Sequence, residues 1–171
     1  MEDVLFECTY TDSEELVRES YSKVRFKRTV DLGRALIFFS VCVLALAIGM
    51  KQLPWGVIAF AVFSAGAYCL YIPGMNARNV MANIRRINKG IVPSANIVIT
   101  NHTITHCYKS NTSNIPLQEL LVVYFLKHSI VLIAEESYTT FERAGFTKGS
   151  PEEFEAFIQE KWPQVQIFHK I

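Results

Sequence analysis

Residues 35–72 read ALIFFSVCVLALAIGMKQLPWGVIAFAVFSAGAYCLYI, and this stretch decides the fold. It holds two apolar runs, 35–50 and 54–72, and neither contains a charged residue. At the rise of an α-helix the runs span about 24 Å and about 28 Å, close to the ~30 Å hydrocarbon core of a bilayer. Only Lys51, Gln52 and Leu53 separate the runs. The stretch therefore predicts a transmembrane helical hairpin.

Composition limits the possible partners and sites outside this hairpin. The chain has 171 residues and a net charge of +1, so no overall field favours nucleic acid. Of the four cysteines, Cys42 and Cys69 lie in the apolar runs, while Cys8 and Cys107 lie outside them without a CxxC spacing. We expect no disulfide framework and no cysteine-based metal site.

Basic residues flank the hairpin on both sides, whereas its tip carries Lys51 alone. Because basic loops stay on the cytoplasmic side of a membrane, we expect both flanks in the cytoplasm and the tip outside. Besides acting as a topology signal, these side chains are also candidates for binding anionic lipid head groups, and both interpretations stay open. The residues that we assign to the membrane surface are Arg25, Lys27, Arg28, Arg34, Arg78, Arg85, Arg86 and Lys89.

Aromatic and small residues within the runs suggest how the helices sit in lipid and pack. Trp55 near the tip, with Tyr68 and Tyr71 at the other end of the second run, fits aromatic belts at the two interfaces. Small residues spaced four apart let helices approach closely, either within the hairpin or in a dimer. These helix-packing candidates are Ala45, Gly49, Ala61 and Ala65.

Neither run contains Asp, Glu, Lys, Arg or His. Ionisable residues inside a membrane usually mark ion or proton paths. Their absence from both runs argues against a transporter or a proton channel.

The segment before the hairpin predicts a strand over residues 4–10, followed by a helix. Thr11 or Asp12 is the expected cap, with Glu14 or Glu15 reaching back to it. With no proline before the first run, we predict one long helix into the membrane with a bend near Gly33. After the hairpin, Pro73 and Gly74 are expected to close the second span, and a separate basic helix then runs to Lys89.

From residue 94 onward the apolar period changes from helical to two, which is typical of β-strands. Ser150 and Pro151 then predict the start of a helix, and Phe154, Phe157, Ile158 and Trp162 give it one apolar face. The short connections favour an α+β fold with a single antiparallel meander, joined by the N-terminal strand and covered by the last helix. Residues 164–171 are either a last strand or a frayed end. The expected strands are 96–100, 103–108, 120–126, 130–135 and 138–141.

No constellation of residues predicts catalysis. His102 and His106 have a spacing that would suit zinc on a helix, but on a strand this spacing separates them by roughly 13 Å. Glu135 and Glu136, if on a strand, point to opposite faces. The sequence contains no GxSxG, P-loop or GxGxxG pattern. We therefore expect a non-enzymatic protein with no catalytic residue, no cofactor and no metal.

The layout resembles the YcxB-like family of small two-span bacterial membrane proteins. The shared features are the strand and capped helix of residues 4–16, the two spans, the basic helix to Lys89 and the β-rich segment after it. LQEL at 117–120 and SYTTF at 137–141 lead to the capped helix at Ser150, an ending similar to that of bacterial pleckstrin-homology-like (PH-like) domains. The resemblance implies a membrane location and no established activity or cofactor.

Four segments follow from these observations: an N-terminal arm (1–34), the transmembrane hairpin (35–72), a basic juxtamembrane helix (73–93) and a cytoplasmic α+β domain (94–171). We expect an inner-membrane protein with both termini in the cytoplasm that presents a PH-like binding or regulatory module to a protein partner or to the membrane surface. The alternative is an immunity or transporter-accessory subunit that recognises a partner through its hairpin. Self-association into a homo-oligomer remains open.

Overall fold

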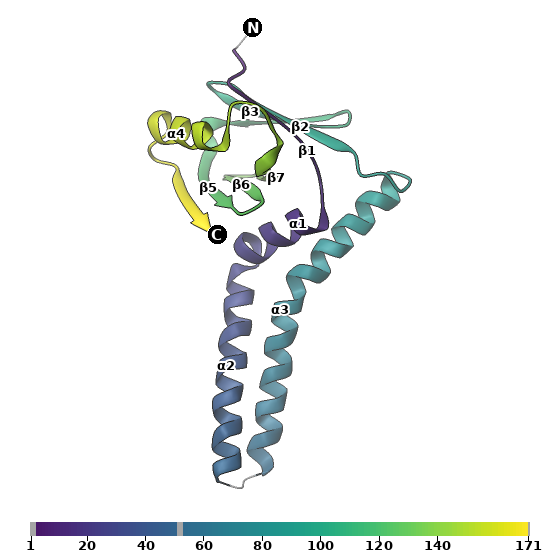
Figure 1. Ribbon diagram of the computed structural model, residues 1–171, viewed down its shortest axis with the longest axis vertical. Coiled ribbons are helices and arrows are strands. Elements are labelled where there is room, and N and C mark those ends of the chain that lie inside the picture. The colour runs from purple at the N-terminus through teal and green to yellow at the C-terminus, as the bar shows by residue number, and fades with distance from the viewer. Residues whose placement is uncertain (1–2, 51–52, 171) are drawn as a thin grey trace. The chain divides into compact units, whose positions relative to one another are not determined.

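The computed structural model describes residues 3–50 and 53–170 (Figure 1). The chain divides into two compact units. One, which we call the β-domain, comprises residues 3–20 and 80–170. The other, the hairpin unit, comprises residues 21–50 and 53–79. The β-domain is thus assembled from both sides of the hairpin in sequence. Lys51 and Gln52, which we expect at the hairpin tip, lie outside the described residues.

Both units are built from regular elements. The helices of the chain are α1 (Glu14–Ser20), a π-helical turn (Tyr21–Arg25), α2 (Lys27–Gly49), α3 (Leu53–Ile87) and α4 (Pro151–Lys161). The strands are β1 (Phe6–Thr11), β2 (Ser94–Ile99), β3 (Thr103–Tyr108), β4 (Asn111–Pro116), β5 (Leu120–Leu126), β6 (Ser129–Ala134), β7 (Tyr138–Glu142), β8 (Phe146–Lys148) and β9 (Gln166–Lys170).

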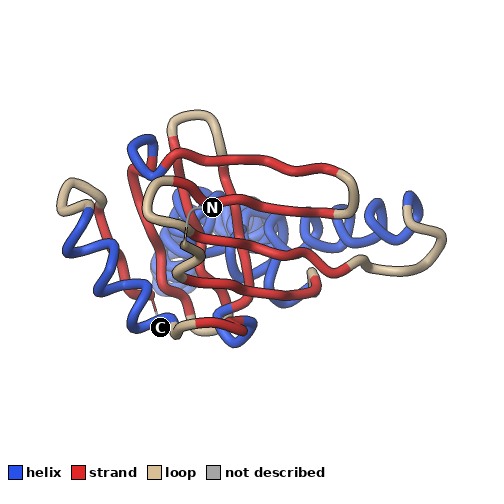
Figure 2. Tube along the Cα trace, turned by 90° about the horizontal axis from the view of Figure 1, so that it is seen from above, coloured by secondary structure: helices blue, strands red, loops and turns tan. Residues whose placement is uncertain are grey.

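The strands of the β-domain form two sheets rather than the predicted single meander. The first has the order β4-β3-β2-β1-β8, and the second has the order β7-β6-β5-β9. Figure 2 shows the strands of one sheet running across those of the other. The short helical turn Leu117–Glu119, where Leu117 is fully buried, carries the chain from one sheet to the other. Two meanders, β2-β3-β4 and β5-β6-β7, therefore replace one.

The N-terminal strand joins the later strands, as predicted. β1 pairs antiparallel with β2 along its whole length, from Phe6 opposite Ile99 to Thr11 opposite Ser94. On its other side it pairs with β8. The hairpin is therefore inserted in the sequence between two neighbouring strands of one sheet.

The core of the β-domain lies between the two sheets and under α4. Phe6, Cys8 and Tyr10 point inward from β1, as the alternation of a strand requires. The Phe6 ring packs against those of Phe154 and Phe157 of α4, each with a centroid distance of 5.6 Å. Ser150 caps α4, since its Oγ accepts a hydrogen bond of 3.1 Å from the backbone N–H of Glu153. The predicted covering helix is thus confirmed.

α1 covers part of the opposite face of the second sheet. Ile130 and Leu132 of β6 belong to the core, so Val131 between them points to the other side, where it too is buried. α1 contacts β6 and β7 there, and its Leu16 and Val17 are buried. The second sheet therefore has one face on the core and the other partly under α1.

In the hairpin unit, α2 and α3 are long and apolar enough to cross a membrane. Only 17% and 11% of their apolar windows are buried, so these helices do not serve as the core of a soluble domain. The two helices approach each other closely at Gly33 and Gly66. A Cβ at either position would lie 2.9 Å from the carbonyl oxygen of the other. Glycine at both positions therefore permits this contact.

The predicted helix boundaries around the hairpin are wrong in two places. The first helix is not continuous, because a π-helical turn interrupts it before α2. In this turn the N–H of Phe26 donates to the carbonyl of Tyr21, which brings the two rings to 5.6 Å. The second helix does not end at Pro73, which lies buried inside α3. The basic segment after Pro73 is the last part of α3 and not a separate helix.

Strand predictions are confirmed for β3 and β5 at the same boundaries, whereas three strands were missed or left open. β4 covers residues for which no strand was predicted, and the turn before it is formed by Lys109 and Ser110. β8 was not predicted. The tail forms the strand β9 and is not a frayed end. β9 runs parallel to β5, so the second sheet is not entirely antiparallel.

Candidate functional site

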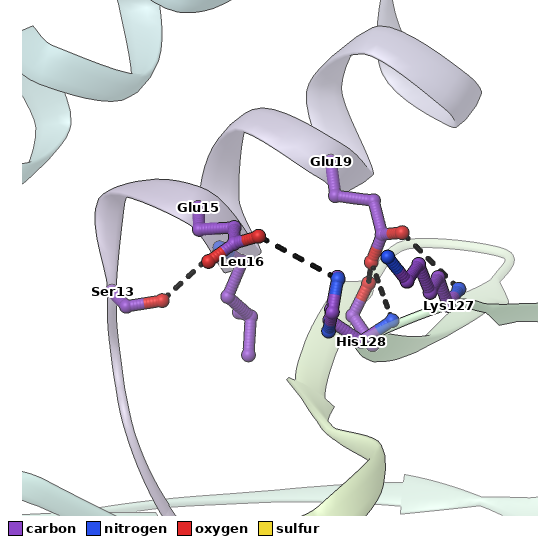
Figure 3. A network of polar contacts seen from close by, with 7 residues as sticks. Ser13, Glu15, Leu16, Glu19, Lys127 and His128 are labelled. Carbon is purple, nitrogen blue, oxygen red and sulfur yellow. Dashed lines mark hydrogen bonds and ion pairs between the residues drawn. The ribbon is translucent and has the colours of Figure 1, made fainter.

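A polar clamp attaches α1 to the second sheet (Figure 3). One carboxylate oxygen of Glu19 accepts a hydrogen bond of 3.1 Å from the backbone N–H of Lys127. The other accepts from the N–H of His128 at 3.0 Å and from the hydroxyl of Ser129 at 2.8 Å. A charged acceptor on three converging donors makes strong hydrogen bonds. Glu19 thus fixes the β5–β6 turn to the helix that directly precedes the hairpin unit.

Other contacts of α1 support this clamp. Ser13 caps the helix by accepting a 3.1 Å hydrogen bond from the N–H of Leu16, so the cap lies later than the expected Thr11 or Asp12. Glu15 lies 3.5 Å from the imidazole of His128, although its side chain is 75% exposed. Tyr138 of β7 donates to the carbonyl of Ser20 at 3.3 Å. α1 is therefore held at several points along its length.

We predict that Glu19→Ala lowers the free energy of unfolding of the β-domain by about 1–3 kcal/mol, because three donors lose a charged acceptor and one of them, Ser129, is fully buried. Glu15→Ala is the matched control on the same helix, and its exposed pair with His128 is worth at most about 1 kcal/mol. Thermal unfolding of the full chain in detergent measures both. Equal losses for the two variants would contradict the clamp.

A second polar cluster lies on the inner face of the first sheet. The hydroxyl of Tyr10 is 3.1 Å from Nε2 of His106. Burial raises the pKa of Tyr10, with Asp12 adding to the effect, and burial lowers the pKa of His106 against the opposing charge of Asp12. Burial also raises the pKa of Asp12, and it raises that of the Cys8 thiol to about 12. These shifts favour the neutral forms of Tyr10 and His106, so the pair serves to satisfy polar atoms inside the domain.

The zinc alternative gains no support from this geometry. His106 lies on β3 and bonds to Tyr10, while His102 lies in the turn before that strand. The sulfur of Cys107 is 3.9 Å from the hydroxyl of Thr112. Within residues 3–50 and 53–170, no group of three or more His, Cys, Asp or Glu side chains is placed to hold a metal ion.

Apolar side chains remain uncovered on the outer face of the second sheet. We call this surface the outer patch and define it as Val122 and Tyr124 of β5, Phe168 of β9, and Leu121, which lies where the register of β5 with β6 shifts between Leu120 and Val122. Leu121 is 47% exposed and Phe168 is 41% exposed. The rings of Tyr124 and Phe168 stack with centroids 5.1 Å apart. Because α1 contacts β6 and β7, the part of this face formed by β5 and β9 is the one that carries the patch.

All eight basic residues assigned to the membrane surface have exposed side chains. Lys27 pairs with Asp31 at 2.6 Å, and Arg34 approaches the same carboxylate at 3.8 Å. The guanidinium of Arg25 lies over the ring of Tyr21 at 5.2 Å. Residues Arg78, Arg85 and Arg86 belong to α3, and Lys89 lies in the turn after it. Their exposure is compatible with a topology signal and with binding of anionic lipid head groups alike.

The four helix-packing candidates do not make the contact within the hairpin. Ala45, Gly49, Ala61 and Ala65 are all exposed, and a Cβ at Gly49 would meet no atom within 4 Å. Among the buried small residues, Gly33, Ser40 and Ala47 on α2 are spaced seven apart, as are Ala59 and Gly66 on α3. The seven-residue repeat keeps one narrow seam facing the other helix. The exposed small residues are therefore available for contact with another molecule. The expected interface aromatics Trp55, Tyr68 and Tyr71 are also exposed.

Comparisons with known proteins add no assignment. No family model matches the chain, and a search of curated proteins finds no match. The function is therefore argued from the geometry alone.

Proposed function

We propose that this chain is a non-enzymatic integral membrane protein whose hairpin anchors a cytoplasmic, PH-like binding module. The observation that carries the proposal is the pairing of β1 with β2, which closes one domain from both sides of the hairpin in sequence. A domain closed in this way requires both ends of the hairpin on one side of the membrane. An even number of spans satisfies that requirement.

Charge and exposure support the membrane part of this proposal. Most of the apolar surface of the two helices is exposed in the structure. Contact of this surface with water is unfavourable, whereas contact with the hydrocarbon of a bilayer is favourable. Basic residues lie on the domain side of both apolar segments, which favours the cytoplasm for the β-domain. The two crossed sheets with a C-terminal helix packed on their core support the PH-like comparison at the level of fold, which by itself assigns no function.

The outer patch is the surface that we assign to the protein partner. Its exposed leucine and phenylalanine lie beside a stacked tyrosine, a composition that is typical of interface cores. The clamp of Glu19 holds α1 beside it, so the patch is bounded by a fixed helix. A partner seated there would contact the β-domain without disturbing its core.

A single set of cysteine variants tests both parts of the proposal. In a chain whose four native cysteines are replaced by alanine, we expect an impermeant thiol reagent to label Met50→Cys in intact cells. Glu160→Cys on α4 and Phe168→Cys in the patch should react only after the membrane is opened. In opened native membranes the 168 position should react more slowly than in the purified chain, while the exposed 160 position serves as the matched control.

Two results would contradict the proposal. Labelling of position 160 in intact cells would put the β-domain outside the cell. Equal reaction rates at position 168 in native membranes and after purification would show that no partner covers the patch.

A second candidate function is favoured by the exposure of the small residues on the hairpin. Ala45, Gly49, Ala61 and Ala65 are free to contact another span. The hairpin also carries an apolar groove of about 460 Å³ lined by residues that include Ser40, Ala59 and Phe60. These features support an immunity or transporter-accessory subunit that recognises its partner within the bilayer.

A further inference from the structure

Four basic side chains gather in the β-domain where α3 ends. Arg85 and Arg86 lie in the last turn of this helix, Lys89 lies in the turn that follows, and all three are exposed. Lys109, from the turn between β3 and β4, reaches the same place, because its Nζ donates a hydrogen bond to Oδ1 of Asn88. We call Arg85, Arg86, Lys89 and Lys109 the basic patch.

The described part of the chain does not neutralise the basic patch. Within residues 3–50 and 53–170, no ion pair joins any of its four cations to an Asp or Glu side chain. Arg86 donates instead to the neutral Oδ1 of Asn83 at 2.9 Å. By contrast, Lys27 lies 2.6 Å from the carboxylate of Asp31. Because uncompensated like charges attract anions, the patch is complementary to a surface that carries several negative charges.

Two isoleucines are exposed beside the basic patch, on either side of the turn that follows α3. Ile87 is 68% exposed and Ile91 is 70% exposed. Hydrogen bonds fix this turn: the N–H of Gly90 donates to the carbonyl of Arg85 at 2.7 Å. The N–H of Ile91 donates to the carbonyl of Asn88 at 3.1 Å. Exposed apolar side chains among basic ones are typical of segments that lie in the interfacial region of a bilayer.

We propose that the basic patch docks on the anionic surface of the bilayer, with its four cations on lipid phosphates and with Ile87 and Ile91 in the interfacial region. The inference deepens the proposed function and rests on it, since the cytoplasmic leaflet is the anionic one. An acidic protein surface would also match the charges. The exposed isoleucines favour lipid, as does the place of the patch at the end of a helix that is apolar enough to cross a membrane.

The length of α3 sets a requirement for this docking. Arg85 lies 13 residues beyond Ile72, where the apolar run ends, which is about 20 Å along a helix. The head-group region adds only about 5–7 Å to each side of the hydrocarbon core, so α3 must lean toward the surface after the apolar run. Pro73 lies inside α3 at the start of this part. A proline removes one helical hydrogen bond and kinks the helix, which supports such an inclined course.

A fluorescent probe at the patch tests the docking. In the full, otherwise cysteine-free chain, Ile91→Cys is labelled with nitrobenzoxadiazole, whose emission rises when it leaves water. We expect several-fold higher emission in vesicles of equal parts phosphatidylglycerol and phosphatidylcholine than in vesicles of phosphatidylcholine alone. In the mixed vesicles, a lipid with a nitroxide on its acyl chain should quench the probe. The exposed Glu160→Cys on α4 is the matched control position, and its emission should be the same in both vesicles.

Removal of charge tests the basic side chains themselves. Lys89→Gln with Lys109→Gln should reduce the lipid-dependent rise at position 91 several-fold. Lys127→Gln with Lys161→Gln makes the same change of net charge at two exposed lysines elsewhere in the β-domain and should leave the rise intact. Equal reductions by the two pairs would overturn the inference.

Two further outcomes would also overturn the inference. Equal emission at position 91 in the two vesicles would show that the patch does not meet anionic lipid. If position 91 is shielded from a thiol reagent in native membranes but not in the mixed vesicles, the patch binds a protein instead. If the docking fails in either way while positions 50 and 160 label in cells as expected, the membrane-anchored module of the proposed function still stands.

Discussion

Deletion of residues 3–11 is expected to unfold the β-domain, although 80–170 would still contain eight of its nine strands. β1 lies between β2 and β8, so its loss exposes the neighbours on both sides. It also removes Phe6, Cys8 and Tyr10 from the core, where they are 7%, 0% and 5% exposed. Truncating a single buried aromatic side chain costs about 3–5 kcal/mol, and a whole domain is stable by only about 5–15 kcal/mol. The deletion is therefore expected to remove most or all of the free energy of unfolding of the β-domain.

Protease protection and thermal unfolding of the full chain in detergent measure this effect. The deleted chain should lose its cooperative transition in the β-domain, while α2 and α3 still retain it in the membrane fraction. Thr9→Ala with Thr11→Ala is the control, since both side chains are exposed and the backbone pairing is unchanged. An unchanged melting temperature after the deletion would show that β1 does not hold the domain together.

The elements most accurately predicted from the sequence are those whose pattern is local. The apolar runs of α2 and α3, the β-branched and aromatic residues of β5 and the Ser150 cap all indicate their structure within a few residues. β4 was not predicted as a strand, because Asn, Thr and Ser are common turn residues. Only its pairing with β3 makes it a strand. β8 has three residues and depends on β1, which is distant in sequence.

Long-range contacts also explain what was missed in the candidate sites. The predicted strands 120–126 and 130–135 leave residues 127–129 as their connection, but nothing near Glu19 indicates that its carboxylate meets that connection. The outer patch depends on the parallel pairing of β9 with β5, which places Phe168 beside Tyr124. Pro73 was predicted to end a helix because it lacks an N–H, yet α3 continues through it. The small-residue spacing was found on the exposed side of the helices, whereas the buried seam repeats every seven residues.

The second large effect is expected for Gly66→Leu, which should separate α2 from α3. Even the first added atom, a Cβ, would lie 2.9 Å from the carbonyl oxygen of Gly33 and 3.1 Å from the backbone nitrogen of Ile37. Backbone atoms in a helix cannot move aside as a flexible side chain can, so the helices must part. Overpacking of this kind costs about 1–3 kcal/mol or more, and the separated helices also lose their remaining seam contacts.

Ala65→Leu is the matched control for this variant, since it makes a similar change at the next residue of the same helix, where the side chain is exposed. In a Trp162→Phe background Trp55 is the remaining tryptophan of the chain, and its fluorescence follows the hairpin during titration with sodium dodecyl sulfate. Gly66→Leu should lower the free energy of helix separation by about 2 kcal/mol or more, and Ala65→Leu by less than about 0.5 kcal/mol. Equal shifts would contradict the glycine contact. Ala65→Leu also distinguishes the two candidate functions. If it leaves the hairpin intact but abolishes binding to another membrane protein, the result favours partner recognition by the hairpin over partner binding at the outer patch. Position 65 belongs to the hairpin unit, whereas β5 and β9 belong to the β-domain.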